Sequence, residues 1–77
     1  MGGGAAASMS WLVKRSFTLA GHRTSVALEP AFWEALETLA AAEARSLASL
    51  ISEVDADRSA DRPLASMLRE HALRATR

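Results

Sequence analysis

The cationic side chains that could bind an anion are concentrated near the N-terminal end of the chain. The first 28 residues contain Lys14, Arg15 and Arg23 and no acidic residue, whereas eight acidic residues lie between Glu29 and Asp61. Ammonium and guanidinium groups bind phosphate, and a guanidinium can also form two hydrogen bonds to one guanine base. The net charge of zero argues against nucleic-acid binding by the chain as a whole. The basic segment is nevertheless a local candidate for it.

Catalytic and metal-binding chemistry finds little support in the sequence. His22 and His71 are the two histidines, and no further ligand is spaced to join them in a metal site. The glycine run at residues 2–4 does not lead into a strand-to-helix unit, so it is not a phosphate-binding loop. No serine lies in the context of a nucleophile elbow or a triad. We therefore expect no enzyme activity, no metal and no cofactor.

Length and composition limit the kind of protein this can be. The chain of 77 residues has room for one domain, and it has no cysteine for a disulfide or a thiolate metal site. Its apolar runs are far shorter than the roughly 20 residues that a membrane-spanning helix needs. Residues 1–11 begin with the low-complexity string MGGGAAAS and are expected to form a flexible tail. Residues 12–77 are left for the folded domain, and we expect a cytoplasmic protein without membrane contact.

A strand is predicted at residues 23–28, because apolar and polar positions alternate there. One side carries Thr24, Val26 and Leu28, and the other carries Arg23, Ser25 and Ala27. Residues 12–20 alternate as well, and Gly21 favours a bend between the two runs because glycine tolerates positive φ. The first run either pairs back on residues 23–28 or forms an extended arm, and the sequence leaves both open.

Helices are predicted after the strand. Pro30 suits the first position of a helix, and apolar residues recur at helical spacing to about residue 44. Ser46 is expected to cap a second helix, in which apolar residues stand at i, i+3, i+4 and i+7 from Leu47. Pro63 starts a third helix with one apolar face, which either packs across a dimer or extends the base of the fold.

A single strand with one apolar face needs a partner for its backbone groups and for its apolar side. One strand followed by two amphipathic helices therefore predicts that a second copy of the chain supplies the partner strand and covers the helical stripes. Trp33 either belongs to this core or lies at its edge with its N–H in water. The expected dimer core is Val26, Leu28, Phe32, Trp33, Leu36, Leu39, Leu47, Leu50, Ile51 and Val54.

The string GHRTSVALEPAFWEAL, followed by SLASLISEVD and LASMLREHAL, resembles small bacterial ribbon-helix-helix domain proteins over roughly residues 12–74. The resemblance implies a mainly α fold with one short β ribbon. Two β-α-α protomers would pair their strands in an intertwined homodimer, with an extra C-terminal helix on each. In that family the ribbon enters the DNA major groove, and most members are transcriptional repressors or antitoxins.

The resemblance also assigns roles to particular residues. The solvent face of the ribbon would contact bases through Arg23, Ser25 and Ala27. Of these, Arg23 would read guanine, Ser25 would discriminate weakly, and Ala27 would touch only a thymine methyl group. The start of the second helix would bind a phosphate through its free backbone N–H groups and its dipole. The expected phosphate contacts are Lys14, Arg15, Arg45, Ser46, Leu47 and Ser49.

The function expected on these grounds is that of a homodimeric DNA-binding regulator. The alternative is a protein-interaction or antitoxin-like module that keeps the dimeric fold without specific DNA readout. The neutral net charge and the short side chains of Ser25 and Ala27 favour this alternative. Trp11, Leu12 or Met67 would then dock a protein partner.

Overall fold

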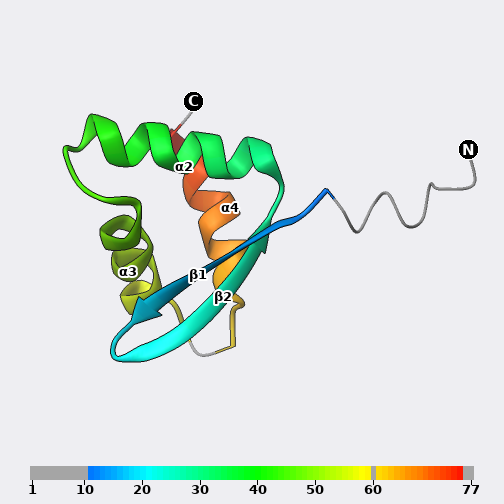
Figure 1. Ribbon diagram of the computed structural model, residues 1–77, viewed down its shortest axis with the longest axis vertical. Coiled ribbons are helices and arrows are strands. Elements are labelled where there is room, and N and C mark those ends of the chain that lie inside the picture. The colour runs from blue at the N-terminus through cyan, green and yellow to red at the C-terminus, as the bar shows by residue number, and fades with distance from the viewer. Residues whose placement is uncertain (1–10, 60, 76–77) are drawn as a thin grey trace, which may run out of the picture.

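A computed structural model describes residues 11–59 and 61–75 (Figure 1). The expected flexible tail, residues 1–11, lies outside these residues except for Trp11. Among the described residues, no helix has the length and apolar character needed to cross a bilayer. The elements in chain order are β1 (Val13–Leu19), β2 (His22–Leu28), α2 (Pro30–Ala42), α3 (Leu47–Asp57) and α4 (Leu64–Ala75).

The two strands pair with each other within one chain, along their whole length. The antiparallel register runs from Val13 opposite Leu28 to Leu19 opposite His22. The run at residues 12–20 therefore pairs back, which is one of the two arrangements that the sequence left open. The partner strand of residues 23–28 comes from the same chain, so the expectation that a second copy supplies it is corrected. A two-residue connection keeps the strands together at a small cost in loop-closure entropy.

The connection between the strands is a tight turn of Ala20 and Gly21. Their φ angles are 53° and 83°, and a type I′ hairpin turn requires positive φ at both central residues. Glycine adopts such a conformation freely, whereas alanine does so at some cost in energy. The right-handed twist of the strands matches this turn type, which explains why the hairpin closes here despite the alanine.

The hydrophobic core lies between the hairpin and the helices. Leu19, Val26 and Leu28 are buried on the inner side of the hairpin. β1 contacts α3, β2 contacts α4, and each of α2, α3 and α4 contacts the other two. In Figure 1, α2 crosses the top, α3 and α4 lie beneath it, and the hairpin passes in front. One chain thus encloses its own core.

The residues expected to form a dimer core are largely buried inside the single chain. Trp33 is only 2% exposed, and its Nε1 donates a hydrogen bond to the carbonyl oxygen of Val13 at 2.7 Å, so its N–H is not in water. α4 completes the core with its own apolar face rather than packing across a dimer. The buried members of the expected set are Val26, Leu28, Trp33, Leu36, Leu50, Ile51 and Val54, and the half-buried ones are Phe32, Leu39 and Leu47.

The C-terminal end of α2 is closed by a Schellman motif that lacks glycine. The backbone N–H of Arg45 bonds the carbonyl of Ala40 at 3.0 Å, and that of Ala44 bonds Ala41 at 3.0 Å. Ala44 has a φ of 56°, a left-handed conformation in which Cβ crowds the backbone. The helix therefore ends at Ala42, two residues before the predicted boundary.

Candidate nucleic-acid interface

The hairpin has a polar face that points away from the core. Side chains alternate along a strand, so every second cross-strand pair shares one side of the sheet. All of the residues on this side are exposed apart from Ala27, which is half-buried. We call this side the outer ribbon face, and it consists of the pairs Lys14–Ala27, Ser16–Ser25 and Thr18–Arg23.

Two side-chain hydrogen bonds cross the outer ribbon face from strand to strand. The hydroxyl oxygens of Ser16 and Ser25 are 3.0 Å apart, and Nη1 of Arg23 donates to Oγ1 of Thr18 at 3.3 Å. A guanidinium has five N–H donors, so most of those on Arg23 remain available to a ligand. The bonds hold the polar side chains in place without consuming the donors that could recognise DNA.

Charge on this face is not balanced by acidic residues. Neither strand contains a carboxylate. Lys14 and Arg23 form no ion pair with a carboxylate, and among residues 11–59 and 61–75 every other lysine or arginine does. The outer ribbon face therefore carries uncompensated positive charge, although the net charge of the chain is zero. The other arginines of that part of the chain, Arg15, Arg45, Arg58, Arg62, Arg69 and Arg74, are all ion-paired.

Arg15 lies on the opposite side of the hairpin from Lys14. Its guanidinium carbon is 5.0 Å from the centre of the Trp33 ring, and Nη1 donates to Oε2 of Glu37 at 2.7 Å. Because neighbours on a strand point to opposite faces, the structure brings Lys14 to the outer ribbon face and directs Arg15 towards α2. Arg15 thus fixes β1 to α2 and uses its charge within the chain.

The start of α3 holds the other predicted phosphate contacts. Ser46 is the N-cap, as predicted, and its side chain accepts a hydrogen bond from the backbone N–H of Ser49 at 3.0 Å. Arg45 extends along this first turn, where it donates to the carbonyl of Ser49 at 2.9 Å and pairs with Glu53. The hydrogen bond that Arg45 donates to the carboxylate of Glu53 raises the pKa of Arg45 above its ordinary value. The side chain of Leu47 packs against the core, so only its backbone could meet a phosphate.

Sequence reasoning missed Ser16 and Thr18 as members of the site. Their alternation with Phe17 already placed them on the same side of β1 as Lys14. What was missing was the register, which sets them beside Ser25 and Arg23. A two-residue connection after residue 19 was the available signal, but Ala-Gly is weaker evidence for such a turn than Asn-Gly or Asp-Gly.

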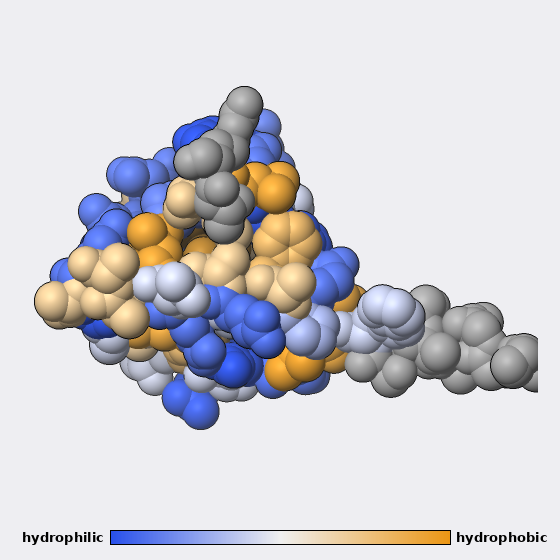
Figure 2. Space-filling view, turned by 90° about the horizontal axis from the view of Figure 1, so that it is seen from above, coloured by the Kyte–Doolittle hydropathy of each residue, from blue (hydrophilic) through white to orange (hydrophobic). Residues whose placement is uncertain are grey.

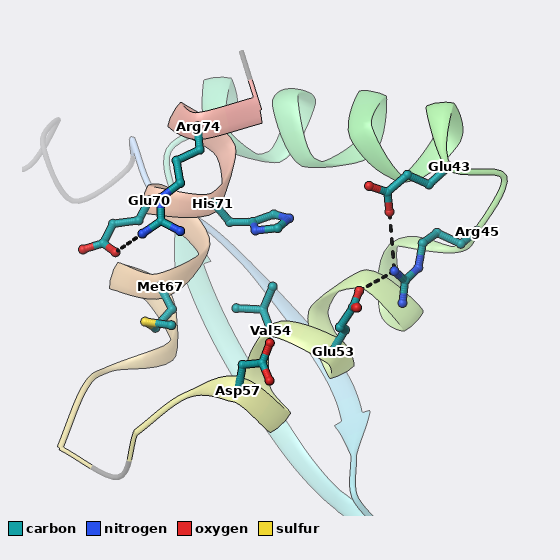
Figure 3. A pocket seen from close by; sticks show the side chains of 9 residues that line it. All are labelled: Glu43, Arg45, Glu53, Val54, Asp57, Met67, Glu70, His71 and Arg74. Carbon is teal, nitrogen blue, oxygen red and sulfur yellow. Dashed lines mark hydrogen bonds and ion pairs between the residues drawn. The ribbon is translucent and has the colours of Figure 1, made fainter. Parts of the chain in front are cut away.

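A cavity of about 420 Å³ is lined mainly by α3 and α4 and has a charged, largely ion-paired lining (Figure 3). Arg45 pairs there with Glu53, and Arg74 pairs with Glu70. Nε2 of His71 is buried without a hydrogen-bond partner. In the part of the chain that the structure describes, no group of three or more His, Cys, Asp or Glu residues is placed to hold a metal ion. These ion pairs lie within α4 and between α3 and the loop before it, so the charged groups of the lining are largely neutralised by near neighbours in the chain.

Comparison with known proteins agrees with this geometry. A family model described as a ribbon-helix-helix domain matches residues 12–76, which include the hairpin and all of α2, α3 and α4. No curated protein and no solved structure was found to match the chain. Proteins with this domain are typically DNA-binding regulators, and they usually form homodimers. The two-stranded ribbon, the order of the helices that follow it and the extent of this match show that the chain belongs to the ribbon-helix-helix domain family.

Proposed function

We propose that this protein is a transcriptional regulator that inserts its hairpin into the DNA major groove. The observation that supports this most is the uncompensated positive charge of Lys14 and Arg23 on an exposed two-stranded ribbon. The major groove is about 12 Å wide and admits such a ribbon. Cations are attracted along the phosphate backbone whatever the sequence. The typical role of the family supports the same function, and we propose repression in the cytoplasm of a bacterium as its setting.

The residues of the outer ribbon face have separate roles in this proposal. Arg23 reads guanine through two hydrogen bonds, to O6 and N7. Ser25 adds a hydrogen bond of low discrimination, and Ala27 contacts a thymine methyl group. Lys14 neutralises a backbone phosphate, which contributes affinity without sequence reading.

The first turn of α3 supplies a flanking phosphate contact in the same proposal. The backbone N–H groups of Ser46 and Leu47 and the hydroxyl of Ser49 are the donors, helped by the helix dipole. Arg15 and Arg45 are left out, because their charges are paired with Glu37 and Glu53.

Self-association is part of the proposal, through a surface of α2 that the single chain leaves partly exposed. The outer side of α2 presents apolar residues at helical spacing, and they line a shallow hollow of about 430 Å³. Figure 2 shows apolar surface on this side of the molecule. A second copy that covered this side would leave both hairpins free for DNA. The apolar residues of α2 in this hollow are Ala31, Ala35, Leu39 and Ala42.

The test of DNA binding is a fluorescence anisotropy titration at low salt with a pool of random-sequence duplexes, followed by a selected duplex. Arg23→Ala should weaken binding to the selected duplex by about 1–3 kcal/mol, because one bidentate base contact is lost. Arg74→Ala removes the same charge from an exposed side chain of α4 and should leave specific binding unchanged. Failure of the unmodified protein to bind any duplex at low salt would remove the proposal.

A second candidate function is a protein-interaction module, including the antitoxin-like variant. The observation in its favour is the exposed apolar stretch before and at the start of β1, where Trp11 is 64% exposed, Leu12 37% and Val13 39%. Met67, by contrast, is half-buried in the core. Affinity capture that returns one stoichiometric protein and no DNA would favour this candidate, and Trp11→Ser should abolish the capture.

A further inference from the structure

The two strands repeat one pattern of side chains on the outer ribbon face. Each strand places a cation first, a serine two residues later and a small side chain two residues after that. Ser16 lies opposite Ser25, so a twofold axis through this central pair exchanges the two strands. That rotation takes Lys14, Ser16 and Thr18 onto Arg23, Ser25 and Ala27.

We infer that the hairpin of one chain is a pseudo-twofold ribbon that reads a nearly palindromic DNA site by itself. The inference rests on the proposed function and identifies the class of DNA site. The pairing of β1 with β2 is complete, so the ribbon needs no strand from a second copy. The two unpaired cations lie at diagonally opposite ends of it, where each has a small residue as its cross-strand neighbour: Ala27 beside Lys14 and Thr18 beside Arg23.

The two halves of the ribbon differ, and so should the two halves of the DNA site. Arg23 presents a planar fork that matches two acceptors of guanine, whereas Lys14 is a point charge on a flexible stem. Thr18 also differs from Ala27, because its hydroxyl is already bonded to Arg23. The half of the site that faces Arg23 should therefore specify guanine more strongly than the half that faces Lys14.

A ribbon shared between two copies would behave differently. Its two strands would be identical, so its site would be a perfect palindrome, and two chains would be needed for each inserted ribbon. When one chain forms the whole ribbon, each chain binds one DNA site. This holds for a monomer and also for a dimer whose interface lies outside the hairpin. The symmetry of the site and the number of sites per chain separate the two arrangements.

The experiment is selection from a library of random-sequence duplexes, followed by native mass spectrometry with an excess of a short duplex that carries one selected site. We expect one duplex per chain at saturation and a site whose two halves differ at the base facing Arg23. One duplex per two chains, or a perfectly palindromic site, would overturn the inference and leave the proposed function standing. Absence of binding to every duplex would instead remove the proposed function, and the inference with it.

A designed variant tests the same inference through symmetry. Lys14→Arg with Ala27→Thr makes the outer ribbon face identical on both strands, and the selected site should then become palindromic. The variant should bind this palindrome more tightly than the unmodified protein does, on the order of 5- to 150-fold for one added bidentate contact. Ala41→Thr on the exposed side of α2 is the control and should leave the selected site unchanged. An unchanged, asymmetric site for the double variant would contradict the inference.

Discussion

Single residues decide where charge is available and where the backbone is strained. Arg15 and Lys14 are adjacent, yet Arg15 is held by Trp33 and Glu37 while Lys14 forms no ion pair. The difference follows from the alternation of side chains along β1. At the end of α2, Ala44 takes a left-handed conformation because the Schellman hydrogen bonds require it there. Neither property can be judged from residue type alone.

Replacing Ala44 by glycine should stabilise the protein. A non-glycine residue in the left-handed region costs roughly 1–2 kcal/mol, and the added freedom of glycine in the unfolded chain offsets about half of the relief. We expect the free energy of unfolding to rise by about 0.5–1 kcal/mol in a chemical denaturation experiment. Ala41→Gly, inside α2, is the matched control and should lower it by about 1 kcal/mol. A loss of stability in both variants would mean that Ala44 is not strained.

The sequence pattern indicates which faces of the strands and helices are buried, but not which elements pack against those faces. The alternation in residues 23–28 predicted the faces of β2 correctly, but alternation does not say which strand pairs with which. The helical stripes were predicted as a core, and hydrophobic periodicity shows which side of a helix is covered without showing what covers it. Residues such as Leu36 and Ile51 are covered by the same chain, because the hairpin and α4 close over them.

Ion pairs near the ends of the helices should make the free energy of unfolding depend on pH in the acidic range. Oε1 of Glu29, just before α2, accepts a hydrogen bond from Arg69 of α4 at 3.0 Å. The hydrogen bond that the carboxylate of Glu29 accepts from the backbone N–H of the same residue, followed by that from Arg69, lowers the pKa of Glu29 below its ordinary value of 4.5. A hydrogen bond from Arg62 lowers the pKa of Glu70 in the same way.

A carboxyl group whose pKa is lower in the folded state stabilises the fold when it is ionised. The stabilisation is therefore complete above pH 4.5, the ordinary value, and is lost as the pH falls through the lowered pKa values. Thermal unfolding followed by circular dichroism should show that the melting temperature falls as the pH is lowered below 4.5. Glu29→Gln should make the fall shallower, whereas Glu34→Gln on the exposed side of α2 should not. Equal acid dependence of Glu29→Gln and the unmodified protein would show that Glu29 contributes nothing.

The whole molecule is electrically neutral, but its charges are segregated. The arginines outside the hairpin are balanced by carboxylates in the described residues, and the outer ribbon face is left positive. Such a surface can bind a polyanion even when the net charge is zero, because the field near a surface depends on local charge. The hollow on the outer side of α2 is lined mainly by apolar residues, which suits it to a second copy.

Self-association through α2 should be sensitive to one charge. Ala31→Glu places a carboxylate in the first turn of α2, where the helix dipole favours it, so the fold itself should be unharmed. The buried like charges of two facing copies should shift the protein towards monomer in sedimentation experiments. Ala41→Glu, which lies on α2 outside the hollow, is the control. Equal dissociation constants for the two variants would place the interface elsewhere.

The most direct test of the central claim, that the outer ribbon face binds DNA, is a salt titration of DNA binding with and without its two cations. The logarithm of the binding constant should fall with the logarithm of salt concentration with a slope of about −1 for each chain, as expected for one phosphate-neutralising cation, Lys14. The double variant Lys14→Ala with Arg23→Ala should lose measurable binding at low salt while keeping its helical circular dichroism. Undiminished binding by a folded double variant would contradict the claim.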